Sequence, residues 1–202
     1  MSLRLLVAST NQGKLAEIKS SLSNLSLDII NLSAFPHLDV SSIEEIGTTF
    51  AENAVLKAKH YSAITQLPTL AEDSGLVIPA LDGNPGIQSA RWFPGSDEDR
   101  NQAILSRMKT ISNRSASFHC SACLYHPHTH VIEMFDGEVE GMIAQESRGD
   151  DGFGYDSIFI PNGYSKSFAE LGKSVKNSLS HRHKALELVK AYLQNHPAFL
   201  TL

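Results

Sequence analysis

The sequence predicts an α/β fold, because short apolar runs typical of strands alternate with longer amphipathic segments typical of helices. Residues 3–8 and 27–30 are such apolar runs, and residues 68–78 contain two more, separated by a polar stretch. Residues 15–25 repeat their apolar side chains with the spacing of one helical stripe, formed by Leu15, Ile18, Leu22 and Leu25. A strand, a polar loop and a helix therefore open the chain.

Composition excludes several classes of protein. The chain has 202 residues, 42% hydrophobic and 19% charged, a globular balance long enough for one large or two small domains. Its net charge of -5 argues against a nucleic-acid or membrane-surface partner, and no run reaches the roughly 18 apolar residues of a membrane helix. The start, Met1 to Arg4, lacks a signal-peptide pattern, so we expect a cytoplasmic protein.

Residues 9–14, Ser-Thr-Asn-Gln-Gly-Lys, lie directly before the first predicted helix. A helix N-terminus exposes unpaired N–H groups and the positive end of the helix dipole, and Lys14 adds a full charge. The segment therefore suits a phosphate group. Taken alone, residues of this kind before a helix are more often an ordinary helix cap.

A second helix is expected to open within residues 44–50. Thr49 and Glu52 have the spacing of a capping box, and the buried stripe would be Phe50, Ala54, Ala58 and Tyr61. Asn53 and Lys57 lie four residues apart on a neighbouring face. We expect Lys57 to be solvated unless an anionic group faces it.

Residues 68–78 are interpreted as a strand, a tight turn and a second strand. The turn would contain Glu72 and Asp73, two adjacent carboxylates, followed by Ser74 and Gly75. Acidic residues where a strand ends can form a ligand site, because loops converge there on a rigid sheet. An Asx turn without any function is the alternative.

The middle of the chain predicts a rigid loop and a third helix. Glycine and proline make residues 79–93 irregular and would orient Arg91. The helix is expected from Ser96 to about Lys109, with Ala103, Ile104 and Met108 facing inward.

Residues 117–125 and 131–135 predict a hairpin, and Asp136-Gly137 is either a second turn or a bulge. Cys120 and Cys123, with nearby histidines, have the spacing of a zinc site. Strand residues three apart point to opposite faces, however, which argues against a shared metal ion.

The last part of the chain predicts a glycine-rich loop over residues 148–156, a strand over 157–160 and a loop over 173–177. A final helix begins within residues 178–184, with Ala185, Leu188, Val189 and Tyr192 inward. Basic side chains gather at its N-terminus, where the dipole disfavours them, so we expect a negatively charged partner nearby.

Three places now indicate a nucleotide phosphate site. Residues 9–14 and the basic residues 176–182 can neutralise phosphates. Glu45 and Asp73 can hold Mg²⁺, which needs one or two carboxylates besides phosphate oxygens. Phe153 can stack on a base.

Taken together, the motifs closely resemble the inosine triphosphate pyrophosphatase family, the XTP/dITP diphosphatases, nearly end to end. Six motifs occur in the family's order: Ser9-Thr10-Asn11-x-x-Lys14, Thr49-Phe50-x-Glu52-Asn53-Ala54-x-x-Lys57-Ala58, Glu72-Asp73-Ser74-Gly75-Leu76, Pro85-Gly86-x-x-Ser89-Ala90-Arg91, Gly152-Phe153-Gly154-Tyr155-Asp156 and Lys176-Asn177-x-x-Ser180-His181-Arg182. The order makes a chance agreement implausible, although each motif alone is weak.

The resemblance implies a single two-lobed α/β domain over residues 1–202, with a long mixed sheet flanked by helices and an active-site cleft between the lobes. It implies a homodimer that uses Mg²⁺ to hydrolyse ITP, dITP and XTP to the monophosphate and pyrophosphate. It also implies roles for individual residues. Asp73 would accept a proton, and Glu45 and Asp73 would bind the metal. Substrate would be bound by Ser9, Thr10, Asn11, Gln12, Gly13, Lys14, Lys57, Ser74, Arg91, Phe153, Gly154, Tyr155, Asp156, Lys176, His181 and Arg182.

Two residues depart from the family pattern, and two other functions remain open. Ser157 stands where proline is common, and Gln88 stands where an aromatic residue is frequent; both affect expected substrate preference rather than activity. A nucleotide sensor with this fold but no turnover would bind ITP and release no pyrophosphate. A zinc or redox protein would depend on Cys120 and Cys123.

Overall fold

The computed structural model describes residues 3–38, 43 and 45–201. Its strands are β1 (Leu3–Val7), β2 (Leu27–Asn31), β3 (Thr69–Val77), β4 (Ser115–Tyr125), β5 (Ile132–Ile143) and β6 (Phe159–Pro161). Its helices are α1 (Gln12–Leu22), α2 (Phe50–Thr65), α3 (Asp97–Arg107), α4 (Phe168–Leu179) and α5 (His181–Asn195), with short 3-10 helices η1 (Leu32–Ala34), η2 (Pro79–Leu81), η3 (Gly86–Gln88) and η4 (Pro197–Leu200).

The strands form one sheet in the order β2-β1-β3-β4-β5-β6. Strand β1 pairs in parallel with β2 and with β3, whereas β5 and β6 are antiparallel, so the sheet is mixed. The predicted α/β class with a mixed sheet flanked by helices is confirmed. Within the described ranges, every helix is too short or too polar to cross a lipid bilayer.

The chain divides into two compact units. Unit 1 comprises Met1–Asp73, Cys120–Gly137 and Arg182–Leu202, and unit 2 comprises Ser74–His119 and Glu138–His181. Strands β3, β4 and β5 contribute residues to both units. Each unit therefore gathers segments that are far apart in the sequence.

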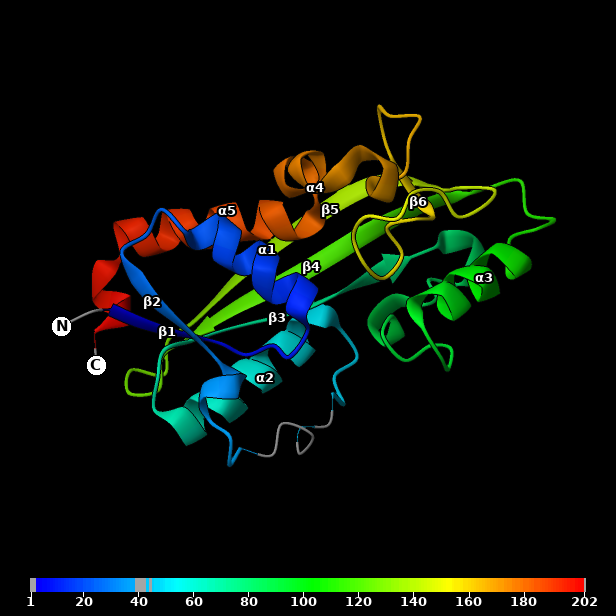
Figure 1. The fold of residues 1–202 in the computed structure, drawn as a ribbon. Helices are drawn as coiled ribbons and strands as arrows, with labels where there is room; N and C mark the ends of the chain where they lie inside the picture. The colour runs from blue at the N-terminus through cyan, green and yellow to red at the C-terminus, as the bar shows by residue number, and fades with distance from the viewer. Residues whose placement is uncertain (1–2, 39–42, 44, 202) are drawn as a thin grey trace. The chain divides into compact units, whose positions relative to one another are not determined.

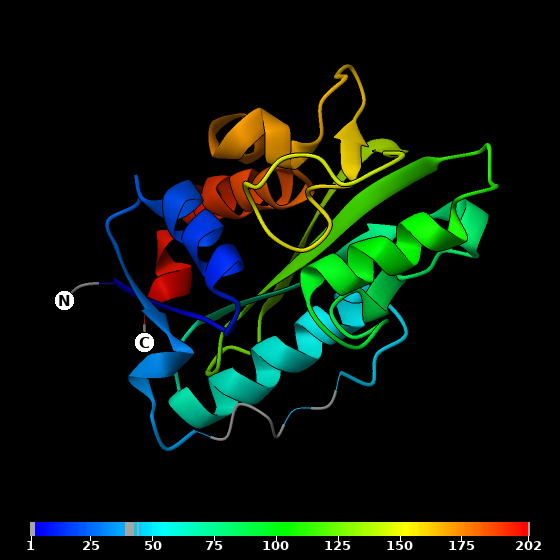
Figure 2. The same ribbon diagram turned by 45° about the vertical axis from the view of Figure 1, so that its right-hand side comes forward.

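Unit 1 is a sheet covered on both faces. Helices α1 and α5 pack on one face and α2 on the other, as Figures 1 and 2 show. Leu5 belongs to the core beneath α1 and α5, whereas its neighbour Leu6 belongs to the core beneath α2, as the alternation of a strand requires. The predicted α1 stripe is buried at Leu15, Ile18 and Leu22; Leu25 lies beyond the end of the helix.

Two expectations about the C-terminal helices are wrong. Residues 173–177 are helical, because α4 resumes after the non-helical Gly172 (φ 76°). Leu188 is 51% exposed rather than inward. The buried side chains of α5 include Arg182, Ala185, Leu186, Val189 and Leu193, so Ala185 and Val189 face inward as expected, whereas Leu186 and Leu193 take the place of Leu188.

The turn expected at Glu72-Asp73 is also wrong, because β3 runs without interruption from Thr69 to Val77. Both carboxylates are buried and have polar or cationic partners within unit 1. These partners compensate for burying acidic side chains inside a strand, where propensity alone disfavours them. Strand alternation then directs Glu72 and Asp73 to opposite faces of the sheet.

Unit 2 has its own core, built around aromatic side chains. Phe118 of β4 packs edge-on against Phe159 at 4.7 Å, and Ile104 and Met108 at the end of α3 are fully buried, as expected. The loop at 79–93 contains the 3-10 helices η2 and η3 rather than being wholly irregular.

The predicted hairpin is confirmed as β4 and β5, which are neighbours in the sheet. Asp136-Gly137 lies inside β5, so a second hairpin turn at that position is excluded. Of the loop expected before α2, residues 39–42 and Glu44 lie outside the described residues.

Candidate active site

Asn11 caps the N-terminus of α1. Its side-chain oxygen accepts a hydrogen bond from the Lys14 N–H at 3.0 Å, and the Asn11 N–H donates to the Ser9 hydroxyl at 3.3 Å. The capping interpretation of this segment is therefore correct for Asn11. The cap directs the Lys14 side chain toward β3, where its ammonium lies 2.8 Å from Glu72 Oε1.

Glu72 is a buried anion between two cations. Besides Lys14, the Nε of Arg182 lies 3.4 Å from Glu72 Oε1, and Arg182 Nη1 also donates to Glu17 Oε2. The Cys120 thiol donates to Glu72 Oε2 at 3.6 Å. The basic start of α5 thus has the negatively charged partners that the sequence predicted, on α1 and β3.

Asp73 faces α2 with a different set of partners. Asn53 Nδ2 donates to Asp73 Oδ2 at 3.0 Å, and the Lys57 ammonium lies 3.4 Å from Asp73 Oδ1. The same ammonium lies 2.7 Å from Glu45 Oε1. Lys57 is therefore not the solvated lysine that helix position alone suggests, because two carboxylates face it.

Glu45 and Asp73 have the chemistry and the spacing that a metal ion requires. Both carboxylates reach one positive charge, so they are already close enough to share a cation. Carboxylate oxygens are the donors that hard divalent ions prefer, and two of them suffice where phosphate oxygens complete the coordination. Groups of three or more metal-binding side chains do not occur among the described residues.

Burial and charge together set the pKa values of these groups. Burial alone would raise the pKa of Glu72, but Arg182, Lys14 and Lys57 hold it well below the usual value. Burial raises the pKa of Asp73, helped by Glu45 and opposed by Lys57 and Lys14. The pKa values of these two adjacent carboxylates are therefore shifted in opposite directions.

The pKa of Lys57 is raised. Burial would lower it, but the charges of Asp73, Glu72 and Glu45 outweigh that effect. Lys57 consequently stays protonated and supplies a permanent positive charge beside Asp73.

Unit 2 contains a second group of predicted residues. The Lys176 ammonium lies 2.6 Å from Asp156 Oδ2 and 4.1 Å from the centre of the Phe153 ring. Both ionic side chains are buried. Asp156 Oδ2 also accepts the Phe153 N–H at 2.9 Å, so one carboxylate fixes both the loop and the lysine.

The loop that carries Phe153 is held from α3. Asp97 Oδ2 accepts the Gly154 N–H at 2.6 Å, and Asn101 Nδ2 donates to the Gly154 carbonyl at 3.0 Å. Gly152 has φ +90°, and a Cβ there would lie 2.2 Å from Asp156 Oδ2, so only glycine fits. The Tyr155 hydroxyl donates to the Ser89 carbonyl, and burial raises the pKa of Tyr155 to about 12.

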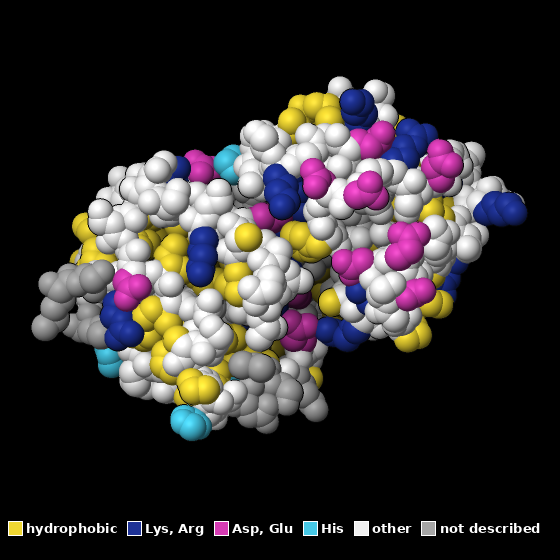
Figure 3. All heavy atoms as spheres, in the orientation of Figure 1, with side chains coloured by type: hydrophobic (Ala, Val, Ile, Leu, Met, Phe, Trp, Pro, Cys, Tyr) yellow, Lys and Arg dark blue, Asp and Glu magenta, His cyan; other side chains and the backbone are white. Residues whose placement is uncertain are grey.

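A cavity of about 370 Å³ adjoins this loop. Carboxylates dominate its charged lining, and Figure 3 shows acidic side chains gathered over α3 and the neighbouring loop. The acidic residues among its lining are Asp97, Glu98, Asp150, Asp151 and Asp156.

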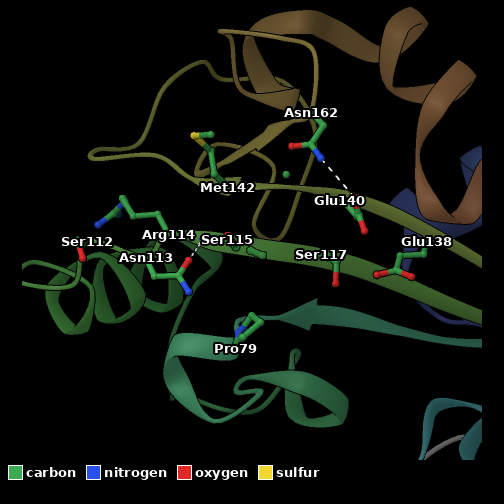
Figure 4. Close-up of a pocket in the computed structure, with 12 residues that line it drawn as sticks. Pro79, Ser112, Asn113, Arg114, Ser115, Ser117, Glu138, Glu140, Met142 and Asn162 are labelled. Carbon is green, nitrogen blue, oxygen red and sulfur yellow. Dashed lines mark hydrogen bonds between the residues drawn. The ribbon is translucent and has the colours of Figure 1, made fainter.

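Another pocket, of about 580 Å³, contains none of the predicted site residues (Figure 4). Arg114 lines it, but the guanidinium donates to the main-chain carbonyls of Met108, Ile143 and Ala144. Glu140 accepts from Asn162 there. The Arg114 guanidinium therefore binds main-chain carbonyl groups and does not form an anion site in this pocket.

The structure brings most predicted site residues into two groups. In unit 1, Lys57 contacts Glu45 and Asp73, whereas Lys14 and Arg182 contact Glu72. The predicted residues Ser9, Thr10, Asn11, Gln12 and Gly13 form the start of α1, directly before Lys14. In unit 2, Phe153, Gly154, Tyr155, Asp156 and Lys176 share one loop and its support.

The remaining predicted site residues are His181, Ser74 and Arg91. His181 is buried and stacks on Phe118 with ring centres 4.7 Å apart. Ser74 follows Asp73 on β3, and Arg91 is exposed after η3, where its N–H donates to the Gln88 carbonyl.

Sequence reasoning did not foresee the roles of Asn53, Glu72 and Glu17. Asn53 is fully buried and contacts Asp73, and Glu72 and Glu17 both contact Arg182. The four-residue spacing of Asn53 and Lys57 was the available signal, since it places both side chains on one face of α2.

The two cysteines belong to different cores of unit 1. Cys120 packs beneath α1 and α5, whereas Cys123 packs beneath α2, which confirms the predicted opposite directions. Burial raises the pKa of the Cys120 thiol well above its usual value and that of Cys123 to about 12. Both side chains are therefore protonated at neutral pH and poorly suited to redox or metal chemistry.

Comparison with known proteins shows the family of the chain, because the match covers most of its length. Residues 5–192 match the sequence model of the Ham1 family. The chain belongs to the Ham1 family. Membership implies in general that a divalent metal ion takes part in the reaction.

Several similar proteins come from bacteria. The dITP/XTP pyrophosphatases of Symbiobacterium thermophilum and Geobacter sulfurreducens are 44% and 43% identical to the chain, over 91% and 94% of its length and 91% and 96% of theirs. The solved structure of a HAM1 protein from Coxiella burnetii has a TM-score of 0.86 at 41% identity, and covers 96% of this chain and 99% of that one.

Proposed function

We propose that the protein hydrolyses the purine nucleoside triphosphates dITP, XTP and ITP to the nucleoside monophosphate and pyrophosphate. Its Ham1 relatives are named dITP/XTP pyrophosphatases at more than 40% identity over nearly the whole chain. The observation that carries the proposal is the contact of one ammonium, that of Lys57, with the carboxylates of both Glu45 and Asp73. This arrangement suits a metal-assisted attack of water on a phosphate.

Glu45 and Asp73 would hold the metal ion, which we propose to be Mg²⁺. A bound Mg²⁺ withdraws negative charge from phosphate oxygens and favours the leaving pyrophosphate. The two carboxylates offer only oxygen donors, the type that Mg²⁺ prefers over zinc ligands such as cysteine.

Asp73 would take the proton from the attacking water. The water oxygen forms a bond to the α-phosphorus, the bond to the bridging oxygen breaks, and pyrophosphate leaves. Burial raises the pKa of Asp73, which makes this carboxylate a stronger base than an exposed aspartate. Asn53 and Lys57 fix the orientation of its carboxylate.

The phosphates would be bound from the start of α1 and from α2. Ser9, Thr10, Asn11, Gln12 and Gly13 surround a helix N-terminus whose free N–H groups favour anions. Lys14 and Lys57 add two positive charges. Because Glu72 and Glu45 already hold these ammonium groups, little side-chain entropy is lost on binding.

The nucleoside would be bound by Ser74, Arg91, Phe153, Gly154, Tyr155, Asp156, Lys176, His181 and Arg182. Phe153 offers an aromatic face for the base. Hypoxanthine and xanthine present O6 as an acceptor where adenine presents an N–H donor. A donor such as Arg182 therefore favours the former and leaves an unpaired group with ATP.

Release of pyrophosphate from ITP, XTP, GTP and ATP with Mg²⁺ tests this function. We expect ITP and XTP to be hydrolysed far faster than GTP and ATP. Equal rates on all four would refute the selectivity. Binding of ITP without pyrophosphate release would instead identify a nucleotide sensor.

We also propose that the protein acts in the cytoplasm as a homodimer. The family resemblance supports the dimer, and the two free cysteines are typical of a reducing compartment. Sedimentation at several protein concentrations would measure the dimer, and a purely monomeric species would contradict it.

A further inference from the structure

We propose that Asn53 is a positioning residue that ties the chain segment carrying Glu45 to the carboxylate of Asp73. Its side-chain amide makes one hydrogen bond in each direction. Nδ2 donates to Asp73 Oδ2 at 3.0 Å, and Oδ1 accepts the Gly47 N–H at 2.9 Å. Asn53 is fully buried, so water does not compete for either bond. The inference rests on the proposed roles of Glu45 and Asp73.

An amide suits this position better than other side chains. It carries a donor and an acceptor and has no charge, so it can bind a carboxylate and a backbone N–H at once. Aspartate would keep the acceptor but lose the donor to Asp73, and leucine would lose both.

Gly47 carries independent evidence for the same link. A Cβ at Gly47 would lie 2.6 Å from Asn53 Oδ1 and 2.8 Å from Glu52 Cβ, closer than real contacts allow. The backbone at Gly47 can therefore approach Asn53 only because this residue lacks a side chain. Glu45 lies two residues earlier on the same segment.

Asn53 and Lys57 hold the two carboxylates in different ways. Lys57, one helical turn later, attracts Glu45 and Asp73 through charge. A flexible ammonium gives attraction with little direction, whereas the amide of Asn53 fixes the position of Asp73 and of the Gly47 backbone. We infer that the carboxylates are prearranged for a divalent ion mainly by Asn53.

Binding of Mn²⁺ to the substrate-free protein, followed by electron paramagnetic resonance, tests this role without depending on turnover. We expect Asn53→Ala to weaken Mn²⁺ binding by about 10- to 100-fold, the usual cost of removing a group that orients metal ligands. With ITP, kcat should fall while KM changes little, because Lys14 and the start of α1 are untouched.

Glu52→Gln is the matched control. Glu52 is the neighbouring residue on α2, and its carboxylate accepts the Thr48 N–H at 2.6 Å and the Thr48 hydroxyl at 2.9 Å. Like Asn53, Glu52 connects the segment before α2 to the first turn of this helix, but it binds Thr48 and not Asp73. We expect Glu52→Gln to bind Mn²⁺ like the wild type.

Gly47→Ala should disrupt the hydrogen bond between the Gly47 N–H and Asn53 Oδ1, because the added Cβ would collide with Asn53. It serves as the second variant if Asn53→Ala fails to fold. The double variant should lose no more Mn²⁺ affinity than the weaker-binding single variant, because both changes remove one link. Wild-type affinity in Asn53→Ala, or an equal loss in Glu52→Gln, would overturn the positioning role. If the wild type itself neither binds Mn²⁺ nor hydrolyses ITP, the proposed function fails instead.

Discussion

Glu72 and Asp73 are neighbours on β3 and are almost equally buried, at 4% and 6% exposure, yet their surroundings shift their pKa values in opposite directions. Glu72 faces Lys14 at 2.8 Å and Arg182 at 3.4 Å. Asp73 faces one ammonium at 3.4 Å and shares it with a second carboxylate, Glu45. Their solvent exposure is similar, so the balance of nearby charges explains the opposite directions of the two pKa shifts.

The difference suggests a division of labour along one strand. Glu72 stays ionised and acts as a fixed counter-charge for the two cations. Asp73 is the more basic of the two, which suits a group that must accept a proton. The four predictions below test this contrast between the carboxylates, beginning with the largest expected effect.

Asp73→Asn should abolish most of the activity but leave the fold intact. We expect kcat with ITP to fall by about 10²- to 10⁴-fold, the usual contribution of a general base. Since the raised pKa means that ionised Asp73 costs stability at neutral pH, the variant should be no less stable than the wild type. Pyrophosphate release and urea unfolding measure the two quantities, and a variant with most of its rate would refute the assignment.

Glu72→Gln should chiefly destabilise the protein, whereas Asp73→Asn chiefly lowers its activity. Removing this charge leaves the buried Arg182 without one of its partners, at a cost of about 3–5 kcal/mol in the free energy of unfolding. Because the pKa of Glu72 is depressed, its stabilisation is present at neutral pH and lost as the pH falls through the folded value. Asp73→Asn is the matched control, and equal stability of the two variants would contradict the contrast.

Glu45→Gln should lower the pKa of Asp73. The Glu45 charge disfavours ionisation of Asp73, so its removal makes the Asp73 proton easier to lose. Carboxyl ¹³C chemical shifts of the metal-free protein, followed against pH, measure this titration directly. A pKa that stays constant or rises would show that burial alone sets it.

Cys120→Ser should have the smallest effect. The serine hydroxyl can replace the thiol as a donor to Glu72 Oε2, so the expected change in unfolding free energy is about 1 kcal/mol or less. Activity with ITP should be retained. Loss of activity together with release of stoichiometric zinc would support the alternative of a zinc or redox protein.

Local pattern was enough to predict much of this molecule. The helical spacing of Leu15, Ile18 and Leu22 predicted α1, and the segment that begins with Ser96 predicted the start of α3. These features depend on interactions within a few residues, which sequence spacing describes directly. The order of the six motifs likewise indicated the family before any geometry was known.

The errors occur where distant residues override local preference. Glu72-Asp73-Ser74-Gly75 has the composition of a turn, but Lys14, Arg182 and Asn53 come from three helices and make a continuous strand stable there. On α5, Leu186 and Leu193 are buried, whereas Leu188 is exposed.

Sequence pattern thus predicts the α/β class, most of the elements and the identity of the charged groups. The pairing of each carboxylate with its cation depends on the three-dimensional fold, because alternation along β3 separates Glu72 from Asp73. The packing of α1, α2 and α5 against the sheet then supplies the charges on each side. Those charges give two neighbouring acids opposite chemical properties.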